Sequence, residues 1–313
     1  MLKAERILVT GGTGFLGTHV CEVLHQYNVK FALARHADYD LTEQVAVRCL
    51  FSNYYPQVVF HLAGYVGGIL ANKQRPADFF YRNLMMNTMV MHEAYLSGVE
   101  KFICLIGGCS YPAQAHSPIV EESLWEGYPQ PESAPYSIAK KMLVVQSEAY
   151  RRQFGFNSIV LVPGNVYGPY DNFNLNDAHV IPALIRKVYE AKRNGQPAVI
   201  VWGSGRPTRD FIYAGDAAEA IVLAAETYNE SDIINISSGC EISIRELVDT
   251  IVRLMDYRGD LAWDTSKPDG QMHKGFAVTR MRQVLKYDPP TSLEQGLRRT
   301  IQWFSENYER ARL

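Results

Sequence analysis

The sequence predicts a doubly wound α/β fold, in which a parallel sheet carries helices on both faces and a smaller mixed α/β domain accompanies it. Two observations lead to this prediction. Short apolar runs alternate with helical patterns over about the first 165 residues, and continuously apolar runs are typical of strands that are buried on both faces. After about residue 165 the alternation loosens, which is expected of a second, mixed domain.

Five apolar runs are expected to form the parallel sheet, and three long helical patterns lie between them. Gly98 stands at the end of the second helical pattern, where a glycine can terminate a helix. The predicted strands span residues 6–10, 30–34, 58–63, 101–106 and 158–162, and the predicted helices span residues 15–27, 78–98 and 136–154.

The later part of the chain is expected to form the smaller domain. No linker rich in proline, glycine or serine separates it from the first domain, so the two are expected to be interleaved. The predicted boundaries assign residues 1–165, with roughly 205–240, to the first domain, and residues 166–204 and 241–313 to the second. Amphipathic helices are predicted at 178–195, 244–255 and 292–311, with short strands at 198–203 and 232–237.

The composition of the chain excludes several classes of protein. The net charge of the 313 residues is −2, so the sequence offers no electrostatic case for binding nucleic acid or a membrane surface. The five cysteines are scattered, without the spacing of a metal site or a disulfide framework, which fits a reducing cytoplasm. The chain starts directly with a predicted strand, without a signal peptide, and no apolar run approaches the length of a membrane span.

A glycine-rich turn links the first predicted strand to the first predicted helix. The segment ILVTGGTGFLG, residues 7–17, places Gly11, Gly14 and Gly17 there. The first glycine permits a tight turn, the next lets the backbone approach a pyrophosphate, and the last packs the helix against the strand. The helix N-terminus then faces the phosphates. The pattern predicts a dinucleotide site, and its spacing is similar to that of the short-chain dehydrogenase/reductase superfamily.

The end of the second predicted strand favours NADP over NAD. An acidic residue at this place would hold the adenosine ribose and indicate NAD. The sequence instead has Arg35, whose cation suits a 2′-phosphate, while Asp38 and Asp40 nearby keep NAD open. The segment HLAG, residues 61–64, is expected to bring backbone to the adenosine and ribose side of the cofactor.

The segment YSIAK places Tyr136 and Lys140 four residues apart at the start of a predicted helix, and therefore on one face. A nearby ammonium stabilises tyrosinate and is expected to lower the pKa of Tyr136 toward working pH. Such a tyrosine can give a proton to a carbonyl oxygen while a hydride arrives at the carbon. The alternative is a pair of surface residues on an amphipathic helix.

With these motifs in place, the chain resembles the GDP-L-fucose synthase family, the GDP-4-keto-6-deoxy-D-mannose 3,5-epimerase-4-reductases. This resemblance implies a Rossmann-like fold, NADPH as cofactor, a GDP-linked 4-ketosugar as substrate, and a homodimer. We expect the dimer interface on the helical segments 78–96 and 137–153. The stretches that carry the resemblance are residues 66–83, 109–112, 135–142, 165–188, 199–213, 265–271 and 302–304.

The resemblance also assigns roles to individual residues. Tyr136 and Lys140 match the catalytic pair of the family, and Cys109 and His179 match its epimerisation acid and base. The positions that match nucleotide-sugar ligands are Asn165, Lys187, Trp202, Arg209 and Asp269. The positions that match cofactor ligands are Gly11, Gly14, Phe15, Leu16, Gly17, Arg35, Asp40, Leu41, Leu62, Ala63, Gly64, Lys140, Pro163, Asn165, Val166 and His179, and no metal is implied.

The chemistry of epimerisation accounts for a thiol and an imidazole. Protons next to the C4 ketone must be removed on one side of the ring and replaced on the other. Cys109 lies at the carboxyl end of a predicted strand, where doubly wound sheets bind ligands. The other four cysteines are expected to be small buried hydrophobic residues. His179 follows Asp177, a candidate helix N-cap, and a positive helix end beside an imidazole lowers its pKa.

Two glycines depart from the family pattern. Gly107 stands where the family usually has a serine or threonine that donates to the substrate ketone, and Gly164 stands where it tends to have threonine. Removing one such donor typically costs on the order of a hundredfold in rate. Ser110 is expected to point away from the ketone, because side chains alternate along a strand. These departures predict an altered substrate, an altered balance of epimerisation and reduction, or slower turnover.

Two other functions stay open at this point. One is a related enzyme that only epimerises, or only oxidises or reduces C4, on another GDP-hexose or heptose. The other is a non-catalytic NADP- or nucleotide-sensing protein, although the presence of Tyr136, Lys140, Cys109 and His179 together speaks against it. The sequence does not identify the sugar.

Overall fold

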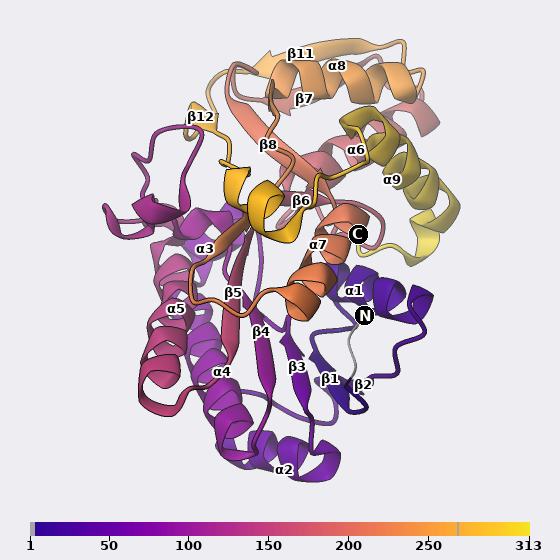
Figure 1. The fold of residues 1–313 in the computed structure, drawn as a ribbon. Coiled ribbons are helices and arrows are strands. Elements are labelled where there is room, and N and C mark those ends of the chain that lie inside the picture. The colour runs from indigo at the N-terminus through magenta and orange to yellow at the C-terminus, as the bar shows by residue number, and fades with distance from the viewer. Residues whose placement is uncertain (1–3, 268) are drawn as a thin grey trace.

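A six-stranded parallel sheet organises the first part of the molecule (Figure 1). The computed structural model describes residues 4–267 and 269–313. The strands of this sheet are β1 (Ile7–Thr10), β2 (Ala32–Ala34), β3 (Val58–His61), β4 (Lys101–Leu105), β5 (Ser158–Pro163) and β9 (Ile234–Ile236). Their order is β2-β1-β3-β4-β5-β9, and neighbouring strands run parallel. The order reverses between β1 and β3, which is the kind of switch point at which such sheets bind ligands.

Helices cover both faces of this sheet (Figure 1). They are α1 (Phe15–Gln26), α2 (Gln44–Tyr54), α4 (Pro76–Leu96), α5 (Ala134–Phe154) and α7 (Ala214–Thr227). α1 and α7 pack together on one face, with Ile7 and Val9 of β1 in their core. α2, α4 and α5 cover the other face, where Leu8 points. The predicted doubly wound α/β fold is confirmed.

The observed elements follow the predicted ones closely in this part of the chain. Each of the five predicted strands is present, and the predicted short strand at 232–237 becomes the sixth, β9. Gly98 has a φ of +72° just after α4, which confirms it as the terminator of that helix. The helices α2 and α7 were not predicted. α7 is alanine-rich and buried along most of its length, so it lacks the polar face that marks an amphipathic helix.

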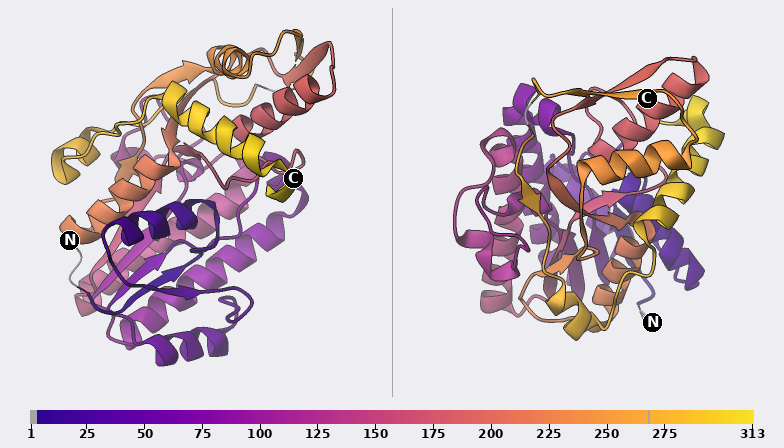
Figure 2. Two further views of the ribbon diagram at one scale, coloured as in Figure 1. Left: turned by 90° about the vertical axis from the view of Figure 1, so that its right-hand side faces the viewer. Right: turned by 90° about the horizontal axis from the view of Figure 1, so that it is seen from above.

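The smaller part of the molecule lies at the carboxyl ends of the main strands (Figure 2). Its helices α6 (Val180–Arg193), α8 (Ile244–Leu254) and α9 (Leu293–Asn307) share a separate apolar core. Two small sheets complete it. Its strands are β6 (Asn165–Tyr167), β7 (Ala198–Trp202), β8 (Thr208–Tyr213), β10 (Glu241–Ser243), β11 (Asp260–Asp264) and β12 (His273–Lys274). β7 pairs with β11, and β8 pairs with β6, β10 and β12.

Serine capping boxes begin two of these helices. Ser243 starts α8 and Ser292 starts α9, and in each case the serine and the residue three positions later exchange hydrogen bonds with each other's backbone N–H. Within the described residues, no helix combines the length and the apolar character needed to cross a membrane. Cys21 and Cys104 are buried as predicted, but the prediction is wrong for Cys49 and Cys240, which are exposed.

Candidate active site

A cavity of about 570 Å³ opens at the carboxyl ends of the main strands, beside the switch point. Both parts of the molecule contribute to its wall, which includes the short helix α3 (Ile69–Gln74) and the start of α6. Many of the residues singled out from the sequence lie along it. They are Gly11, Gly14, Phe15, Leu16, Gly17, Leu62, Ala63, Gly64, Gly107, Cys109, Tyr136, Lys140, Pro163, Gly164, Asn165, Val166 and His179.

The glycine turn has no room for side chains. Gly11 has a φ of +70°, and a Cβ there would lie 2.5 Å from the backbone nitrogen of Ala63. A Cβ on Gly17 would collide with the carbonyl oxygen of Gly11. Gly14, the N-cap of α1, provides no side-chain cap, so the first N–H groups of this helix remain available at the cavity. A bare backbone cradle at a helix N-terminus fits the pyrophosphate of a dinucleotide.

Tyr136 and Lys140 lie in the first turns of α5, and both line the cavity. Lys140 is 5 % exposed, and its burial lowers its pKa to about 8, against the opposing effect of Cys104 and Cys109. Burial also raises the pKa of Tyr136, and the nearby Cys109 adds to this rise. The predicted lowering of the Tyr136 pKa is therefore wrong for this structure, because burial of the phenol dominates.

Cys109 follows β4 on a short 3₁₀ turn, Gly108–Ser110, rather than on a continued strand. A Cβ built on Gly107 would lie 3.2 Å from the Cys109 Sγ and 3.8 Å from the Tyr136 hydroxyl. The thiol and the phenol therefore meet at one point of the cavity wall. Ser110 is buried, and its hydroxyl donates to the carbonyl oxygen of Ser137 at 3.5 Å. It is directed elsewhere, as expected, but the strand alternation on which that expectation rested does not extend to residue 110.

The two unusual glycines differ in what surrounds them. At Gly107 a Cβ would require only a shift of a few tenths of an ångström by Cys109, so this glycine leaves usable space beside the Tyr136 hydroxyl. At Gly164 a Cβ would lie 3.0 Å from the Ser237 Cβ and would collide with the Ser237 hydroxyl. The side chain of Ser237 thus fills the space that a threonine at position 164 would need.

His179 lines the cavity at the start of α6 and is itself the N-cap, with extended backbone and no side-chain cap. The prediction that Asp177 caps this helix is wrong. The Asp177 carboxylate accepts from the Asn172 amide at 2.7 Å, and its carbonyl oxygen accepts from the Gly68 N–H at 2.9 Å. The surrounding protein lowers the pKa of His179, although Asp177 opposes this change. The direction agrees with the prediction, but its cause is the protein crowded around an imidazole that is itself exposed at the cavity, and not the helix end.

The residues matched to nucleotide-sugar ligands, apart from Asn165, lie outside this cavity around β7 and β8. The Lys187 Nζ lies 5.0 Å from the ring centroid of Trp202, which is 56 % exposed. Asp269 accepts from the backbone N–H of Ser204 at 2.6 Å, and Arg209 donates to the carbonyl oxygen of Gln271 at 2.7 Å. Among these side chains Lys187 and Arg209 are cationic and Trp202 is aromatic, which suits a nucleotide diphosphate.

Three residues matched to cofactor ligands also lie outside the cavity. Arg35 is exposed just beyond β2. Asp40 accepts from the Thr42 hydroxyl at 2.7 Å, and this contact holds the Asp40 pKa below its ordinary value. Leu41 is buried in the core beneath α2 and α4, so only its backbone could approach a ligand.

Lys274 was missed by sequence reasoning, yet it lines the cavity from β12. Burial lowers its pKa, and Cys109 is close enough to oppose that change. No motif surrounds this lysine in the sequence. It reaches the site because β12 pairs in parallel with β8, bringing His273 opposite Thr208 and Lys274 opposite Arg209.

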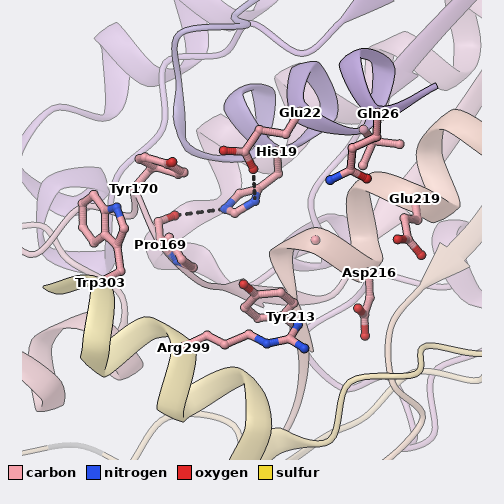
Figure 3. Close-up of a pocket in the computed structure, with 12 residues that line it drawn as sticks. His19, Glu22, Gln26, Pro169, Tyr170, Tyr213, Asp216, Glu219, Arg299 and Trp303 are labelled. Atoms are coloured by element: carbon pink, nitrogen blue, oxygen red, sulfur yellow. Dashed lines mark hydrogen bonds and ion pairs between the residues drawn. The ribbon is translucent and has the colours of Figure 1, made fainter. Parts of the chain in front are cut away.

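A second, smaller cavity of about 280 Å³ lies where α1, α7 and α9 meet (Figure 3). His19 of α1 bonds the carbonyl oxygen of Pro169 at 3.0 Å and contacts the carboxylate of Glu22 at 3.3 Å. Asp216 of α7 accepts from the Thr291 hydroxyl at 2.7 Å. The contacts of His19 with Pro169 and of Asp216 with Thr291 join α1 and α7 to the smaller part of the molecule, whereas His19 and Glu22 both belong to α1.

Comparison with known proteins shows similarity along nearly the whole chain. Residues 7–237 match the model of the NAD dependent epimerase/dehydratase family. GDP-L-fucose synthase of Sinorhizobium fredii is 42% identical over 98% of each chain, and that of Escherichia coli is 38% identical over 99% of this chain and 100% of its own. A GDP-L-fucose synthetase structure from Naegleria fowleri bound to NADP matches with a TM-score of 0.92, at 33% identity, over 100% of this chain and 98% of that one. A GDP-6-OMe-4-keto-L-xylo-heptose reductase of C. jejuni matches with a TM-score of 0.92, at 27% identity, over 98% and 99% of the chains.

Proposed function

Because the chain belongs to the GDP-L-fucose synthases within the NAD dependent epimerase/dehydratase family, we propose that it epimerises C3 and C5 and reduces C4 of a GDP-4-keto-6-deoxy sugar with NADPH. The observation that carries this proposal is the meeting of phenol and thiol. The Tyr136 hydroxyl and the Cys109 Sγ both lie within 4 Å of one point at Gly107. A carbonyl and its acidic α-carbon can be reached from such a place.

The cofactor fits the backbone cradle. Gly11, Gly14 and Gly17 would hold the pyrophosphate at the start of α1, and Leu62 to Gly64 would contact the adenosine side. NADPH supplies the hydride for C4 when it is bound. Arg35 is the cation proposed for the 2′-phosphate, since it is exposed at the end of β2 near the turn.

Side chains of the protein donate and remove the protons in both reactions. Tyr136 donates to the C4 oxygen, where charge develops both in the enolate of epimerisation and during reduction. The ammonium of Lys140 favours the charged form of that phenol when the tyrosine has given up its proton. Cys109 and His179 remove and return the protons at C3 and C5. Asn165 donates to the carbonyl oxygen of Asp210 at 2.7 Å, which fixes the orientation of its amide at the cavity.

The nucleotide end of the substrate is proposed to bind around β7 and β8. Lys187 and Arg209 would neutralise the diphosphate, and Trp202 offers an exposed ring to the base. In this scheme residues 1–165 with roughly 205–240 bind NADPH, and residues 166–204 with 241–313, joined by Arg209 of β8, bind the GDP-sugar. The catalytic cavity lies between them.

We also propose a cytoplasmic homodimer that pairs through α4 and α5. These helices pack side by side, and large apolar side chains remain exposed on them. They are Phe80, Tyr81, Leu96, Val145 and Phe154. Such a concentration of exposed apolar residues is typical of an interaction surface. Sedimentation velocity tests this part: a dimer is expected, and a monomer at micromolar concentration contradicts it.

The enzymatic proposal is tested by incubating the protein with GDP-4-keto-6-deoxymannose and NADPH. Oxidation of NADPH with formation of a GDP-6-deoxyhexose supports it, and the configuration of the product at C3 and C5 distinguishes a full epimerase-reductase from a C4 reductase. Binding of both ligands without any NADPH oxidation contradicts it.

A further inference from the structure

The ring of Phe276 packs behind the cavity wall, against two of its glycines. A Cβ on Gly108 would lie 2.4 Å from the Phe276 Cζ and 2.9 Å from its Cε1, and a Cβ on Gly164 would lie 3.2 Å from its Cδ2. Phe276 is 2 % exposed, and both glycines line the cavity. The tip of the ring therefore occupies the place of a side chain at position 108, directly before the Cys109 thiol.

The turn that carries Cys109 has little support of its own. Cys109 lies beyond the end of β4, and Gly107 and Gly108 lead to it. The backbone of glycine has more conformational freedom than that of any other residue. The turn is closed by a hydrogen bond from the N–H of Ser110 to the carbonyl oxygen of Gly107, at 2.9 Å. The ring of Phe276 restricts it at its first residue, Gly108.

Phe276 is itself held by contacts outside this turn. Its N–H donates to the Asp210 Oδ2 of β8 at 3.3 Å. Phe276 also pairs with Ile119 in an isolated bridge. In this bridge the N–H of Ile119 donates to the carbonyl oxygen of Gly275, and its carbonyl oxygen accepts from the N–H of Ala277, both at 2.8 Å. The position of the ring is therefore set independently of the turn that it supports.

We propose that Phe276 is a positioning residue for epimerisation, whose ring fixes the turn Gly108–Ser110 and thereby aims the Cys109 thiol at the substrate. This inference rests on the proposed function, which assigns Cys109 to proton transfer at C3 and C5. Proton transfer requires a closely held group, because a misplacement of about 1 Å can cost about a hundredfold in rate. A ring that fills the place of the missing side chain supplies that restraint.

The substitution Phe276→Leu separates the two contacts of the ring. It keeps Cδ atoms, which face Gly164, and removes the Cε and Cζ atoms, which face Gly108. The readout is deuterium uptake at C3 and C5 of GDP-4-keto-6-deoxymannose in D₂O, with NADP in place of NADPH so that no hydride can be transferred. We expect kcat for uptake to fall about tenfold while KM stays within about twofold of the wild type.

The substitution Gly108→Ala tests the same contact from the other side. Gly108 is not among the residues with a positive φ, so the strain on alanine comes from the Phe276 ring and not from the backbone. Displacement of the turn is expected to lower deuterium uptake about tenfold. In the double variant the methyl group occupies the space that the ring tip leaves, and uptake is expected to return to within about threefold of the wild type.

The substitution Phe51→Leu is the matched control. Phe51 is buried in the same apolar core as Phe276, but it lies on α2. The control is expected to lower the melting temperature about as much as Phe276→Leu does, and to leave deuterium uptake within about twofold of the wild type. Should Phe276→Leu not fold, Phe276→Met takes its place, since methionine also lacks the ring.

Alkylation of Cys109 by iodoacetamide, followed by mass spectrometry, provides a second readout that needs no substrate. The thiol is partly exposed at the cavity. Its alkylation rate is expected to change about threefold or more in each single variant at positions 108 and 276, because the turn moves, and to return to the wild-type rate in the double variant.

Three results overturn the inference. In the first, Phe276→Leu takes up deuterium as fast as Phe51→Leu. In the second, the loss in the double variant equals the product of the two single losses, which shows that the positions act independently. In the third, neither single variant changes the alkylation rate of Cys109. A wild-type protein without deuterium uptake rejects the proposed epimerisation instead, and the alkylation rates then still decide whether Phe276 positions Cys109.

Discussion

Gly107 stands against the hydroxyl of Tyr136, since a Cβ at position 107 would lie 3.8 Å from that oxygen and 3.2 Å from the Cys109 sulfur. The backbone conformation does not require a glycine at this position, because a φ of −88° is accessible to any residue. It therefore removes a side chain from the point where the substrate ketone would bind. Four predictions follow from this point and from the groups around it.

Gly107→Ser is expected to accelerate C4 reduction about tenfold or more, because a hydroxyl there adds a second donor to the developing oxyanion. Gly107→Ala is the matched control, since it adds the same Cβ without a donor. The measurement is kcat for NADPH oxidation with the GDP-ketosugar. If the serine variant is no faster than the alanine variant, the absence of a hydroxyl at position 107 does not limit the rate. The space beside Tyr136 would then accommodate part of the substrate.

Gly11→Ala is expected to weaken NADPH binding by more than about tenfold, because the methyl group would meet the backbone of Ala63 at the cofactor cradle. Gly98→Ala provides the control. Its φ of +72° is nearly the same as the +70° of Gly11, but nothing lies within 4 Å of its Cβ. Gly98→Ala should lose about 1–2 kcal/mol of stability from the left-handed backbone, and Gly11→Ala should lose more because its methyl group also meets the Ala63 backbone. Equal NADPH affinities for the two variants would contradict the claim that the backbone at Gly11 binds the cofactor.

The rate of ketone reduction is expected to fall as pH rises through about 8, because burial lowers the pKa of Lys140 to that value and the ammonium is then lost. The readout is kcat/KM for NADPH oxidation between pH 6 and pH 10. Lys140→Met should abolish this dependence along with most of the activity. A flat profile across this range in the wild type would show that the charge of Lys140 is not needed.

Asp171→Asn is expected to stabilise the ligand-free protein at neutral and alkaline pH. Burial raises the Asp171 pKa from 3.8 to about 7, so the unfolded chain loses this proton more readily than the folded one, and stability falls as pH rises from about 4 to about 7. Arg312 is the charged group that offsets this cost in part. The asparagine variant has no carboxyl group to ionise. Its free energy of unfolding is therefore expected to exceed that of the wild type by up to about 4 kcal/mol above pH 7, and to equal it below pH 4.

Urea denaturation at pH 4 and at pH 8 measures this difference. Asn176→Asp, which adds a carboxylate at an exposed position of the same loop, serves as a control for a general charge effect. A variant at position 171 that is no more stable than the wild type at pH 8 would show that the Asp171 carboxylate is already compensated.

The parts of the site that sequence reasoning found are those with local signatures. The glycine turn requires a strand, a tight turn and a helix in succession, and Tyr136 and Lys140 require only one helical turn. Each of these depends on neighbours within a few residues. These motifs could be recognised without knowledge of the fold, and the structure places them along the same cavity.

The parts that were missed depend on contacts between distant segments. Lys274 arrives through the pairing of β12 with β8, and Asp171 is aligned by Arg312, which lies 141 positions later in the sequence. The wrong assignment of Asp177 as a cap has a local cause instead, because its carboxylate accepts a hydrogen bond from Asn172, five positions earlier. The pKa of Tyr136 depends on burial that no spacing of residues reveals.

The most direct test of the account follows the substrate protons in D₂O. The protein is incubated with GDP-4-keto-6-deoxymannose and NADPH, and the isolated product is analysed by NMR for deuterium at C3 and C5. The account predicts deuterium at both carbons, a hydrogen from NADPH at C4, and loss of the deuterium label in a Cys109→Ser, His179→Gln double variant. A reduced product without deuterium at either carbon would contradict the role of Cys109 and His179.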